Sequence, residues 1–278
     1  MIPTRRRSEA ILWHVVLVMA LVGTVLPLLF TLATSFKLQR DIAAGNWLFA
    51  PTLNNFIALF SGDSSFPTLA RNSLVVATAT TLIVVTIGSL LAYSLSQFNW
   101  PRWFPRLMIG WMVVVHLIPP VTFIFPLYSL IRSAGLYDTP LAVVIGHSVF
   151  LLPLTTFILL DFFQSVPKPI VEAAVLEGAD NPTLFARILL PLAGAGIGAA
   201  GILAFIFSWR EYAYALSITS TDAAATVPVG IAAFVQENSI IYGQMAAASI
   251  LALLPALLGI FFAQKRIVGG LTLGGVSE

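Results

Sequence analysis

The chain has 278 residues, of which 58% are hydrophobic and 9% charged, with a formal net charge of +2 and a mean hydropathy of +0.94. Soluble globular domains carry about 25% charged residues, so this composition excludes a water-exposed globular surface and indicates a membrane protein. Cysteine is absent, which excludes disulfides, thiolate metal sites and cysteine nucleophiles.

Apolar segments long enough to cross a bilayer recur along the chain. A helix needs about 20 mostly apolar residues for this. Prolines interrupt the third and fourth candidates, and the pair Arg210-Glu211 lies in the fifth. We predict an all-α, polytopic membrane protein whose residues 1–278 form a single transmembrane domain with six spans, at about 11–35, 70–96, 107–132, 140–164, 188–217 and 241–264.

Basic residues predict the orientation of these spans. Six spans place both termini on one side, and with that side inside, nine basic residues fall in inner segments and five in outer segments or span edges. Inner segments of membrane proteins carry the excess of Lys and Arg, and the cluster Arg5–Arg7 dominates the first span. The apolar run after it has about 25 residues, longer than the 7–15-residue core of a secretory signal. We expect an uncleaved first helix and cytoplasmic termini.

The segment 167–191, between the fourth and fifth spans, has the signals of a helical elbow. Pro169 suits the first turn of a helix that runs from Ile170 to Glu177, and Gly178 suits a left-handed cap. Asn181 is then expected to N-cap a second helix. On the first helix, one face is predicted to hold Val171, Ala174 and Val175.

The elbow carries the pattern E-A-A-x3-G-x9-I-x-L-P, from Glu172 to Pro191. This pattern resembles the cytoplasmic signature of permease subunits in bacterial ATP-binding-cassette importers. The resemblance implies a short coupling helix that docks on a separate ATPase subunit, with small alanines allowing close approach and glutamates taking basic or N–H partners. The implied coupling residues are Glu172, Ala173, Ala174, Glu177, Gly178, Asp180 and Pro191.

An amphipathic helix lying on the bilayer surface is the alternative for this segment. Such a helix is expected to carry Lys and Arg on its polar face. This one carries Glu172, Glu177 and Asp180, with Lys168 and Arg187 only at its edges. The charges therefore favour docking on a protein.

Further motifs resemble a narrower family, the shorter permease of maltose-type carbohydrate importers. They are Asn72-Ser73, Ile118-Pro119-Pro120, Pro126-Leu127-Tyr128, Gly135-Leu136-Tyr137-Asp138-Thr139, Trp209-Arg210-Glu211-Tyr212 and the tail from Gly270 to Val276. Two positions depart from the family pattern, because Arg210 replaces a common Asn and the tail ends in Ser277-Glu278.

This resemblance implies a complex in the bacterial cytoplasmic (inner) membrane that works by alternating access. The partners would be a second permease subunit, two ATPase subunits, an extracytoplasmic solute-binding protein, a carbohydrate substrate and the lipid bilayer, with no nucleic acid. No Gly-rich loop of this chain ends in Gly-Lys-Ser/Thr, and only three lysines exist. We expect a non-catalytic chain that binds no cofactor, with ATP and Mg on the ATPase subunits.

Polar groups inside spans are candidates for the substrate path, since burying them is costly. The candidates are Trp209, Arg210, Glu211, Tyr212, Tyr128, His116 and His147. The alternatives are an Arg210–Glu211 pair that anchors a helix end, hydrogen bonds between helices for the two histidines, and packing for Tyr128. Arg210 suits an anionic substrate, whereas the neighbouring Glu211 weakens that interpretation.

Other functions stay open at this stage. A polyol or glycerol-phosphate importer subunit is the first alternative, because relatives of this family carry such solutes. A stand-alone secondary transporter would need a chain of buried carboxylates, and a membrane enzyme would need a convergent cluster of catalytic groups. Neither pattern occurs in the sequence.

Overall fold

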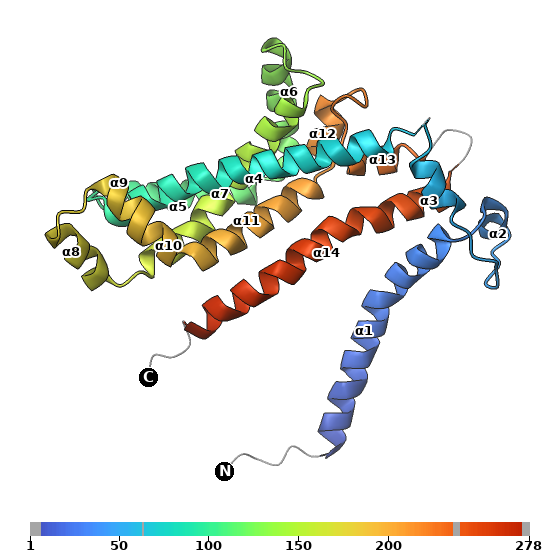
Figure 1. Ribbon diagram of the computed structural model, residues 1–278, viewed down its shortest axis with the longest axis horizontal. Helices are drawn as coiled ribbons and strands as arrows, with labels where there is room; N and C mark the ends of the chain where they lie inside the picture. The colour runs from blue at the N-terminus through green and yellow to red at the C-terminus, as the bar shows by residue number, and fades with distance from the viewer. Residues whose placement is uncertain (1–6, 63, 236–239, 274–278) are drawn as a thin grey trace. The chain divides into compact units, whose positions relative to one another are not determined.

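The computed structural model describes residues 7–62, 64–235 and 240–273. These residues are mostly helical and contain no strand beyond one isolated bridge between Val235 and Ile240 (Figure 1). The predicted all-α class is thereby confirmed. Arg5, Arg6 and the tail positions 274–278, used above as sequence signals, lie outside the described residues. The chain divides into two compact units, residues 1–66 with 231–253 and residues 67–230 with 254–278.

The first unit contains the long helix α1 and two short helices. Asn55 closes the C-terminal end of α1, because its side-chain amide donates hydrogen bonds to the carbonyls of Ser35 (2.9 Å) and Lys37 (2.8 Å). Next to this contact, the ring of Phe36 lies 5.2 Å from that of Phe56. The helices of this unit are α1 (Arg7–Ser35), α2 (Gln39–Ala43) and α3 (Asn54–Leu59).

The second unit contains most of the remaining helices. They are α4 (Phe66–Gln97), α5 (Trp103–Leu117), the 3₁₀ turn η1 (Pro120–Phe123), α6 (Ile124–Ser133), α7 (Pro140–Gln164), α8 (Lys168–Leu176), α9 (Asn181–Thr183), the π-helical turn η2 (Leu184–Leu189), α10 (Leu190–Leu192), α11 (Gly194–Trp209), α12 (Ala213–Ile218) and α13 (Val227–Ala232). The last helix, α14 (Tyr242–Leu273), has residues in both units.

Four of these helices are long and apolar enough to cross a membrane: Leu12–Ser35, Phe66–Gln97, Pro140–Gln164 and Tyr242–Gly259. Two further pairs pass the same test only together, and both are bent. Trp103–Leu117 and Pro120–Ser133 meet at 99°, and Asn181–Leu192 and Gly194–Trp209 meet at 76°. The described chain thus has four spans, or six if each bent pair crosses the membrane once.

The two bends fall within the predicted third span, which prolines were expected to interrupt, and within the predicted fifth span. In the third, Ile118 precedes Pro119 and adopts an extended conformation (φ −80°, ψ 127°), as residues before proline prefer. The fifth ends earlier than residue 217, because α11 stops at Trp209 and Arg210 is its C-cap. The Arg210-Glu211 pair therefore follows the helix and does not lie within it.

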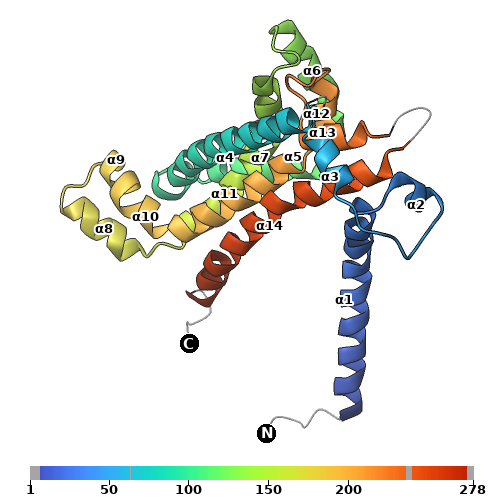
Figure 2. The ribbon, with the colours of Figure 1, turned by 45° about the vertical axis from the view of Figure 1, so that its right-hand side comes forward.

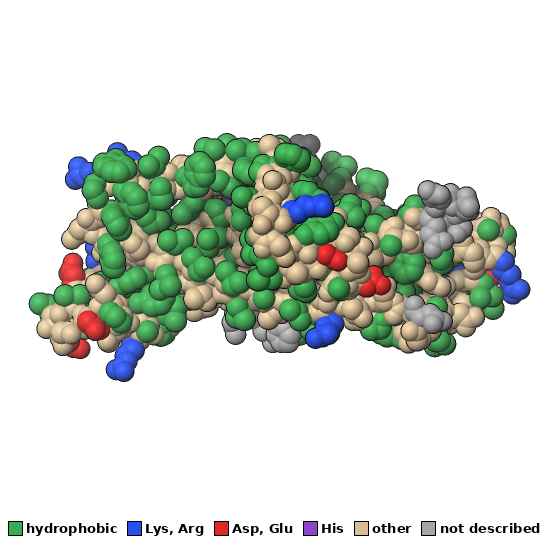
Figure 3. Space-filling view, turned by 90° about the horizontal axis from the view of Figure 1, so that it is seen from above, with side chains coloured by type: hydrophobic (Ala, Val, Ile, Leu, Met, Phe, Trp, Pro, Cys, Tyr) green, Lys and Arg blue, Asp and Glu red, His purple; other side chains and the backbone are tan. Residues whose placement is uncertain are grey.

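The exterior of the molecule is apolar, as a bilayer requires. Leu17, Leu21 and Leu26 on α1 are each more than 60% exposed. On the face drawn in Figure 3, apolar side chains cover most of the area and charged groups are sparse. Such a surface is stable only where lipid or protein covers it.

Helix α7 has eleven buried residues and packs against α11. The contact is close where Gly196 of α11 faces Phe162 of α7. A Cβ atom on Gly196 would lie 2.1 Å from Cγ of Phe162. Small residues at helix interfaces allow such close approach in membranes, so Gly196 has a packing role between α7 and α11.

The substitution Gly196→Ala is expected to destabilise the folded protein by about 1–3 kcal/mol, because the added methyl group forces Phe162 or a backbone to shift. The measurement is the apparent unfolding temperature in detergent. Gly110→Ala is the matched control, since a Cβ atom on this helical glycine of α5 meets nothing within 4 Å. Equal melting of the two variants would contradict the packing argument.

Candidate functional site

The first candidate site is the elbow formed by α8, α9, η2 and α10, which lies at one end of α4, α7 and α11 (Figures 1 and 2). Helix α8 begins after Pro167, has Pro169 in its first turn and ends at Leu176. Gly178 adopts φ +88°, as predicted for a left-handed cap. Its N–H donates to Val175, and the N–H of Ala179 donates to the carbonyl of Ala174 (both 3.0 Å). These two bonds define a Schellman ending.

The second helix of the elbow starts one residue earlier than predicted. Asp180, not Asn181, is the N-cap, and its carboxylate accepts a hydrogen bond from the N–H of Thr183 (3.0 Å). The hydrogen bonds from Thr183 lower the pKa of Asp180 below its usual range. Both side chains suit an N-cap, so the sequence alone gave no basis for choosing between them.

The two faces of α8 differ from the prediction in one respect. Ala174 is buried and Val171 packs against the same apolar cluster, but Val175 is 54% exposed. Successive helical residues are turned by about 100°, which takes Val175 out of the packed face next to Ala174. Ala174 therefore packs within its own chain. The outward face contains Ile170, Glu172, Ala173, Val175, Leu176 and Glu177.

Aromatic rings attach the elbow to the long helices. Phe185 of η2 lies 5.1 Å from the ring of Tyr93 on α4, and it stacks on Phe163 of α7 with centroids 6.2 Å apart. The hydroxyl of Tyr93 also donates to the carbonyl of Asn181 (3.1 Å). A movement of α8 would thus reach α4 and α7 through packed side chains. Tyr93, Phe163 and Phe185 are far apart along the chain, so no local sequence signal predicted their contact.

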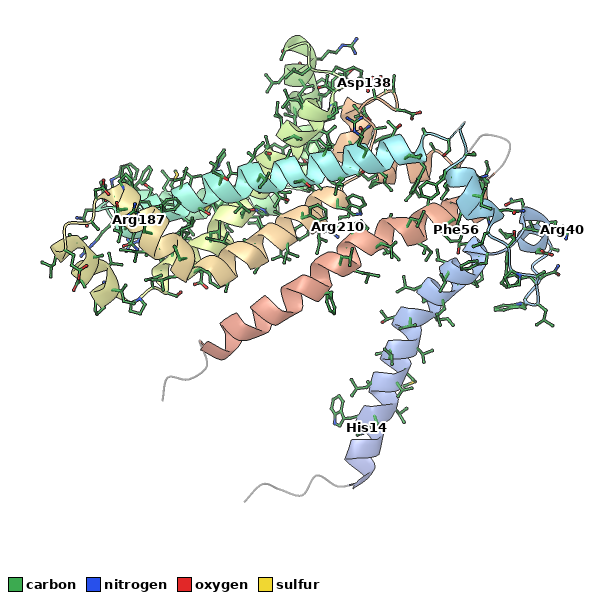
Figure 4. The ribbon with its side chains drawn as sticks, in the orientation of Figure 1. His14, Arg40, Phe56, Asp138, Arg187 and Arg210 are labelled. Atoms are coloured by element: carbon green, nitrogen blue, oxygen red, sulfur yellow. The ribbon has the colours of Figure 1, made fainter. Side chains whose placement is uncertain are left out.

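The last of the predicted coupling residues, Pro191, lies in α10, directly before the bend at Ala193 that leads into α11. Arg187 lies in the elbow and Arg210 at the far end of α11 (Figure 4). The elbow and the second candidate site are therefore joined by one helix.

The second candidate site is a cavity of about 530 Å³ at that far end. It brings together five of the predicted substrate-path residues, His116, His147, Arg210, Glu211 and Tyr212. The rest of the lining is largely apolar and consists of Pro120, Phe150, Leu151, Leu154, Phe207, Ser208, Ala213 and Tyr214. Cavities of this size and character are typical of small-molecule sites in proteins.

A buried hydrogen-bond network forms one side of this cavity. His147 of α7 contacts the hydroxyl of Ser208 on α11 through Nδ1 (2.7 Å) and the carboxylate of Glu211 through Nε2 (3.1 Å). The same carboxylate accepts hydrogen bonds from the N–H groups of Tyr214 (2.9 Å) and Ala215 (3.2 Å), at the start of α12. The prediction that His147 bonds another helix is confirmed by its contact with Ser208. The carboxylate of Glu211 is held by three polar contacts, one from α7 and two from the start of α12.

Two other expectations for this region are wrong. Arg210 and Glu211 do not form the expected anchoring pair, because Glu211 turns toward His147 while the guanidinium of Arg210 lies 4.6 Å from the centre of the Phe207 ring. His116 bonds the carbonyl of Met112 in its own helix (2.9 Å), where a bond to another helix was expected.

The remaining substrate-path candidates lie outside the cavity lining. Trp209 is 8% exposed and stacks on Phe205, with centroids 6.0 Å apart. Tyr128 accepts a hydrogen bond from Arg132 on α6, and its ring meets Tyr137 edge-on at 5.6 Å. The tryptophan and the tyrosine therefore both pack against other aromatic rings and do not line this cavity.

Beyond the cavity, Asp138 holds the loop that follows α12 (Figure 4). Its carboxylate accepts hydrogen bonds from the N–H groups of Ser220 (2.9 Å) and Thr221 (3.1 Å) and from the Thr221 hydroxyl (2.7 Å). Asp138 has φ 59°, which is uncommon for a residue other than glycine. Asn72 holds the same loop from α4, donating to the carbonyls of Asp222, Ala223 and Ala225.

Burial raises the pKa of Asp138, but the hydrogen bonds from Ser220 and Thr221 outweigh it, so the pKa falls below its usual range. A carboxyl with a depressed pKa in the folded state stabilises that state above its unfolded pKa of about 4, and this contribution is lost as the pH falls through the folded value. The contact is therefore expected to persist throughout the neutral range.

The substitution Asp138→Asn is expected to loosen this loop, because an amide offers one acceptor oxygen and turns a donor toward N–H groups. Hydrogen exchange of peptides covering 219–223 should accelerate by about tenfold or more. Asp222→Asn, at an exposed acid of the same loop, is the control. Unchanged exchange in Asp138→Asn would show that other contacts order the loop.

The fold and these sites define a polytopic helical membrane subunit with an exposed elbow at one end and a cavity at the other. Residues 84–270 match the family described as "Binding-protein-dependent transport system inner membrane component". This match spans more than half of the chain, and the protein therefore belongs to that family of transporter permease subunits.

Individual relatives agree over nearly the whole length. The chain is 33% identical over 271 residues to the trehalose transport system permease protein SugB of Mycobacterium tuberculosis (strain CDC 1551 / Oshkosh), covering 96% of this chain and 98% of SugB. It is 32% identical over 259 residues to the sulfoquinovosyl glycerol transport system permease protein SmoH of Agrobacterium fabrum (strain C58 / ATCC 33970), covering 92% and 90%. A crystal structure of a bacterial ABC transporter that imports the acidic polysaccharide alginate matches with a TM-score of 0.77 at 17% identity, covering 95% of this chain and 98% of that one, and this supports the fold.

Proposed function

We propose that this chain is the shorter permease subunit of an ATP-driven carbohydrate importer, in which it forms half of the translocation pathway. The observation that carries the proposal is the elbow, whose helix α8 presents Glu172, Ala173 and Glu177 outward and ends at the left-handed Gly178. An exposed helix with this acidic face suits docking on a protein better than lying on an anionic membrane.

In this proposal the elbow is cytoplasmic and receives the ATPase subunits, which hold ATP and Mg. Both termini are then also cytoplasmic, and six spans are used. A second permease completes the pathway, and a solute-binding protein delivers substrate to the opposite end, in line with the binding-protein-dependent family. Closure of the ATPases would move α8, and through the rings of Tyr93, Phe185 and Phe163 it would move α4 and α7. This transmission supports alternating access.

The cavity is the part of the pathway that we assign to the substrate. Aromatic side chains such as Phe150 and Tyr212 offer faces for a sugar ring, and His116 and Arg210 offer polar groups at the same cavity. SugB and SmoH, whose names give glycosides as their solutes, support a carbohydrate. A polyol or a glycerol phosphate is the alternative solute.

The test is ATP hydrolysis by the purified complex in nanodiscs, with its solute-binding protein and a panel of saccharides, polyols and glycerol phosphate. We expect the ATPase subunits to co-purify with this chain and at least one saccharide to stimulate hydrolysis. Absence of the ATPase subunits from the complex would contradict the importer function. Stimulation by a polyol or by glycerol phosphate alone would contradict the carbohydrate.

A further inference from the structure

The cavity lining includes Arg210, whose guanidinium makes no salt bridge to a carboxylate within the described part of the chain, although Glu211 lines the same cavity. Arg210 belongs to the cavity lining, and its contact there is the face of the Phe207 ring, 4.6 Å from the guanidinium. A ring face attracts a cation but leaves its N–H donors free to bond other groups. An arginine presents five such donors in a fixed, planar arrangement that matches a carboxylate or a similar anion.

The neighbouring Glu211 does not cancel this charge locally, because its own oxygens are already engaged. They accept from the N–H groups of Tyr214 and Ala215 and contact Nε2 of His147. The sequence places Arg210 and Glu211 side by side, yet the structure directs them to different partners. The carboxylate of Glu211 is thus oriented toward α7 and α12, and the guanidinium of Arg210 is oriented toward the Phe207 ring.

A second polar group at the cavity lacks a partner. Tyr214 lines the cavity and is 2% exposed, and its hydroxyl makes no hydrogen bond to any described residue. A buried hydroxyl without a partner costs about 1–3 kcal/mol, so such groups are rare in stable structures. The ring of Tyr214 packs on Phe150, with centroids 5.1 Å apart, which fixes its position. Because the hydroxyl oxygen itself is buried, a bound ligand would satisfy it after a small movement of the surrounding side chains.

We infer that the cavity receives an acidic saccharide, with Arg210 recognising its carboxylate or sulfonate and Tyr214 bonding one of its hydroxyl groups. The inference rests on the proposed function and narrows its substrate class. Among the described residues, the cavity combines a guanidinium that makes no salt bridge, a tyrosine hydroxyl without a hydrogen-bond partner and aromatic walls formed by Phe150 and Tyr212. A neutral sugar would use the walls and the hydroxyl but would leave the guanidinium without an anion.

The phosphate of a lipid headgroup is another source of an anion for Arg210. Arg210 is an exposed residue at the end of a membrane helix, where arginines commonly meet headgroups. A lipid contact predicts that Arg210 affects lipid binding and leaves saccharide selectivity unchanged. If Arg210 binds an acidic saccharide, its substitution changes saccharide selectivity and leaves lipid binding unchanged. Experiment therefore separates the two sources of the anion.

The test is binding of glucuronate and glucose to the intact complex in nanodiscs, measured by saturation-transfer NMR without the solute-binding protein. In phosphatidylcholine nanodiscs we expect glucuronate to bind at least about tenfold more tightly than glucose, as one charge-assisted bidentate contact provides. Arg210→Gln should bring this ratio close to one, and Arg210→Lys should restore part of it. Arg132→Gln removes an exposed arginine of α6 that does not line the cavity, and it should keep the wild-type ratio.

Tyr214→Phe tests the hydroxyl separately and should weaken both sugars about equally, by several-fold. A ratio near one in the wild type, or one that Arg210→Gln leaves unchanged, overturns the inference. Tighter binding of glycerol phosphate than of glucuronate also overturns the inference. The same holds if Arg210→Gln changes the binding of phosphatidylglycerol but not that of the saccharides. If ATPase stimulation by a neutral saccharide persists in these cases, the proposed importer function stands without the acidic substrate. If no ATPase subunit is present in the complex, the importer function itself fails.

Discussion

The substitution Gly178→Val is expected to abolish saccharide-stimulated ATP hydrolysis while the permease still folds in the membrane. Gly178 has φ +88°, a conformation that costs a β-branched residue about 1–2 kcal/mol or more. The surroundings impose no steric limit, because a Cβ atom there meets nothing within 4 Å. The effect is therefore one of backbone conformation. Straightening or unwinding this turn moves the outward face of α8 relative to the rest of the elbow.

The expected loss of stimulated ATP hydrolysis is large because the turn at Gly178 orients the outward face of α8. The Schellman bonds of Gly178 and Ala179 end α8 and lead the chain to the N-cap Asp180, so the orientation of Glu172 and Glu177 depends on them. A cost of about 1.4 kcal/mol changes an equilibrium tenfold, so we expect stimulated hydrolysis to fall by at least about tenfold. The measurement is stimulated against basal ATPase rate in nanodiscs.

Two further variants separate coupling from general damage. Gly178→Asn should retain most of the stimulation, because asparagine tolerates the left-handed conformation. Gly135→Val introduces a similar strain at φ +70° in the turn after α6, also with open space around it, and should leave coupling largely intact. If both valine variants lose stimulation equally, or if Gly178→Val keeps it, the elbow is not the transmission element.

The elbow is the part of this protein that its sequence predicts best. Its turn depends on neighbours along the chain: prolines before α8, a glycine after it and an N-capping side chain two residues further on. Such signals are local, so the helix, the left-handed glycine and the position of Pro191 followed from them. The two wrong predictions in the elbow also concern single residues. Asp180 is the N-cap where Asn181 was expected, and Val175 lies on the exposed face of α8.

The cavity is predicted much less well, because its contacts join distant segments. Polar character near a span end singled out Arg210, Glu211 and Tyr212, and all three line the same cavity in the structure. Their partners were not predictable, since His147 and Glu211 are 64 residues apart and Asp138 meets Thr221 across 83 residues. Tyr214 was missed entirely. Its orphaned hydroxyl exists only once α7 and α12 are packed together.

The substitution Glu211→Gln is expected to reduce the rate of substrate transport by about tenfold or more. It should also lower the free energy of unfolding of the protein by about 1–3 kcal/mol. One carboxylate oxygen accepts from Tyr214 N–H, and the other accepts from Ala215 N–H and contacts His147. A glutamine keeps the shape but offers only one acceptor oxygen, so its NH₂ group must face a donor. Leaving such a donor unpaired in a partly buried site carries the stated cost.

A double-mutant cycle with His147→Gln identifies the contact that carries this effect. If His147 and Glu211 act through their mutual contact, each single variant loses it, and the double variant should be less damaged than the sum by about 0.5–3 kcal/mol. Transport in proteoliposomes and the apparent unfolding temperature are measured for all four proteins. Asp161→Asn, at an exposed acid near the end of α7, is the control and should match the wild type. Strictly additive losses would mean that Glu211 acts only as the cap of α12, and that α7 is not linked to the cavity through His147.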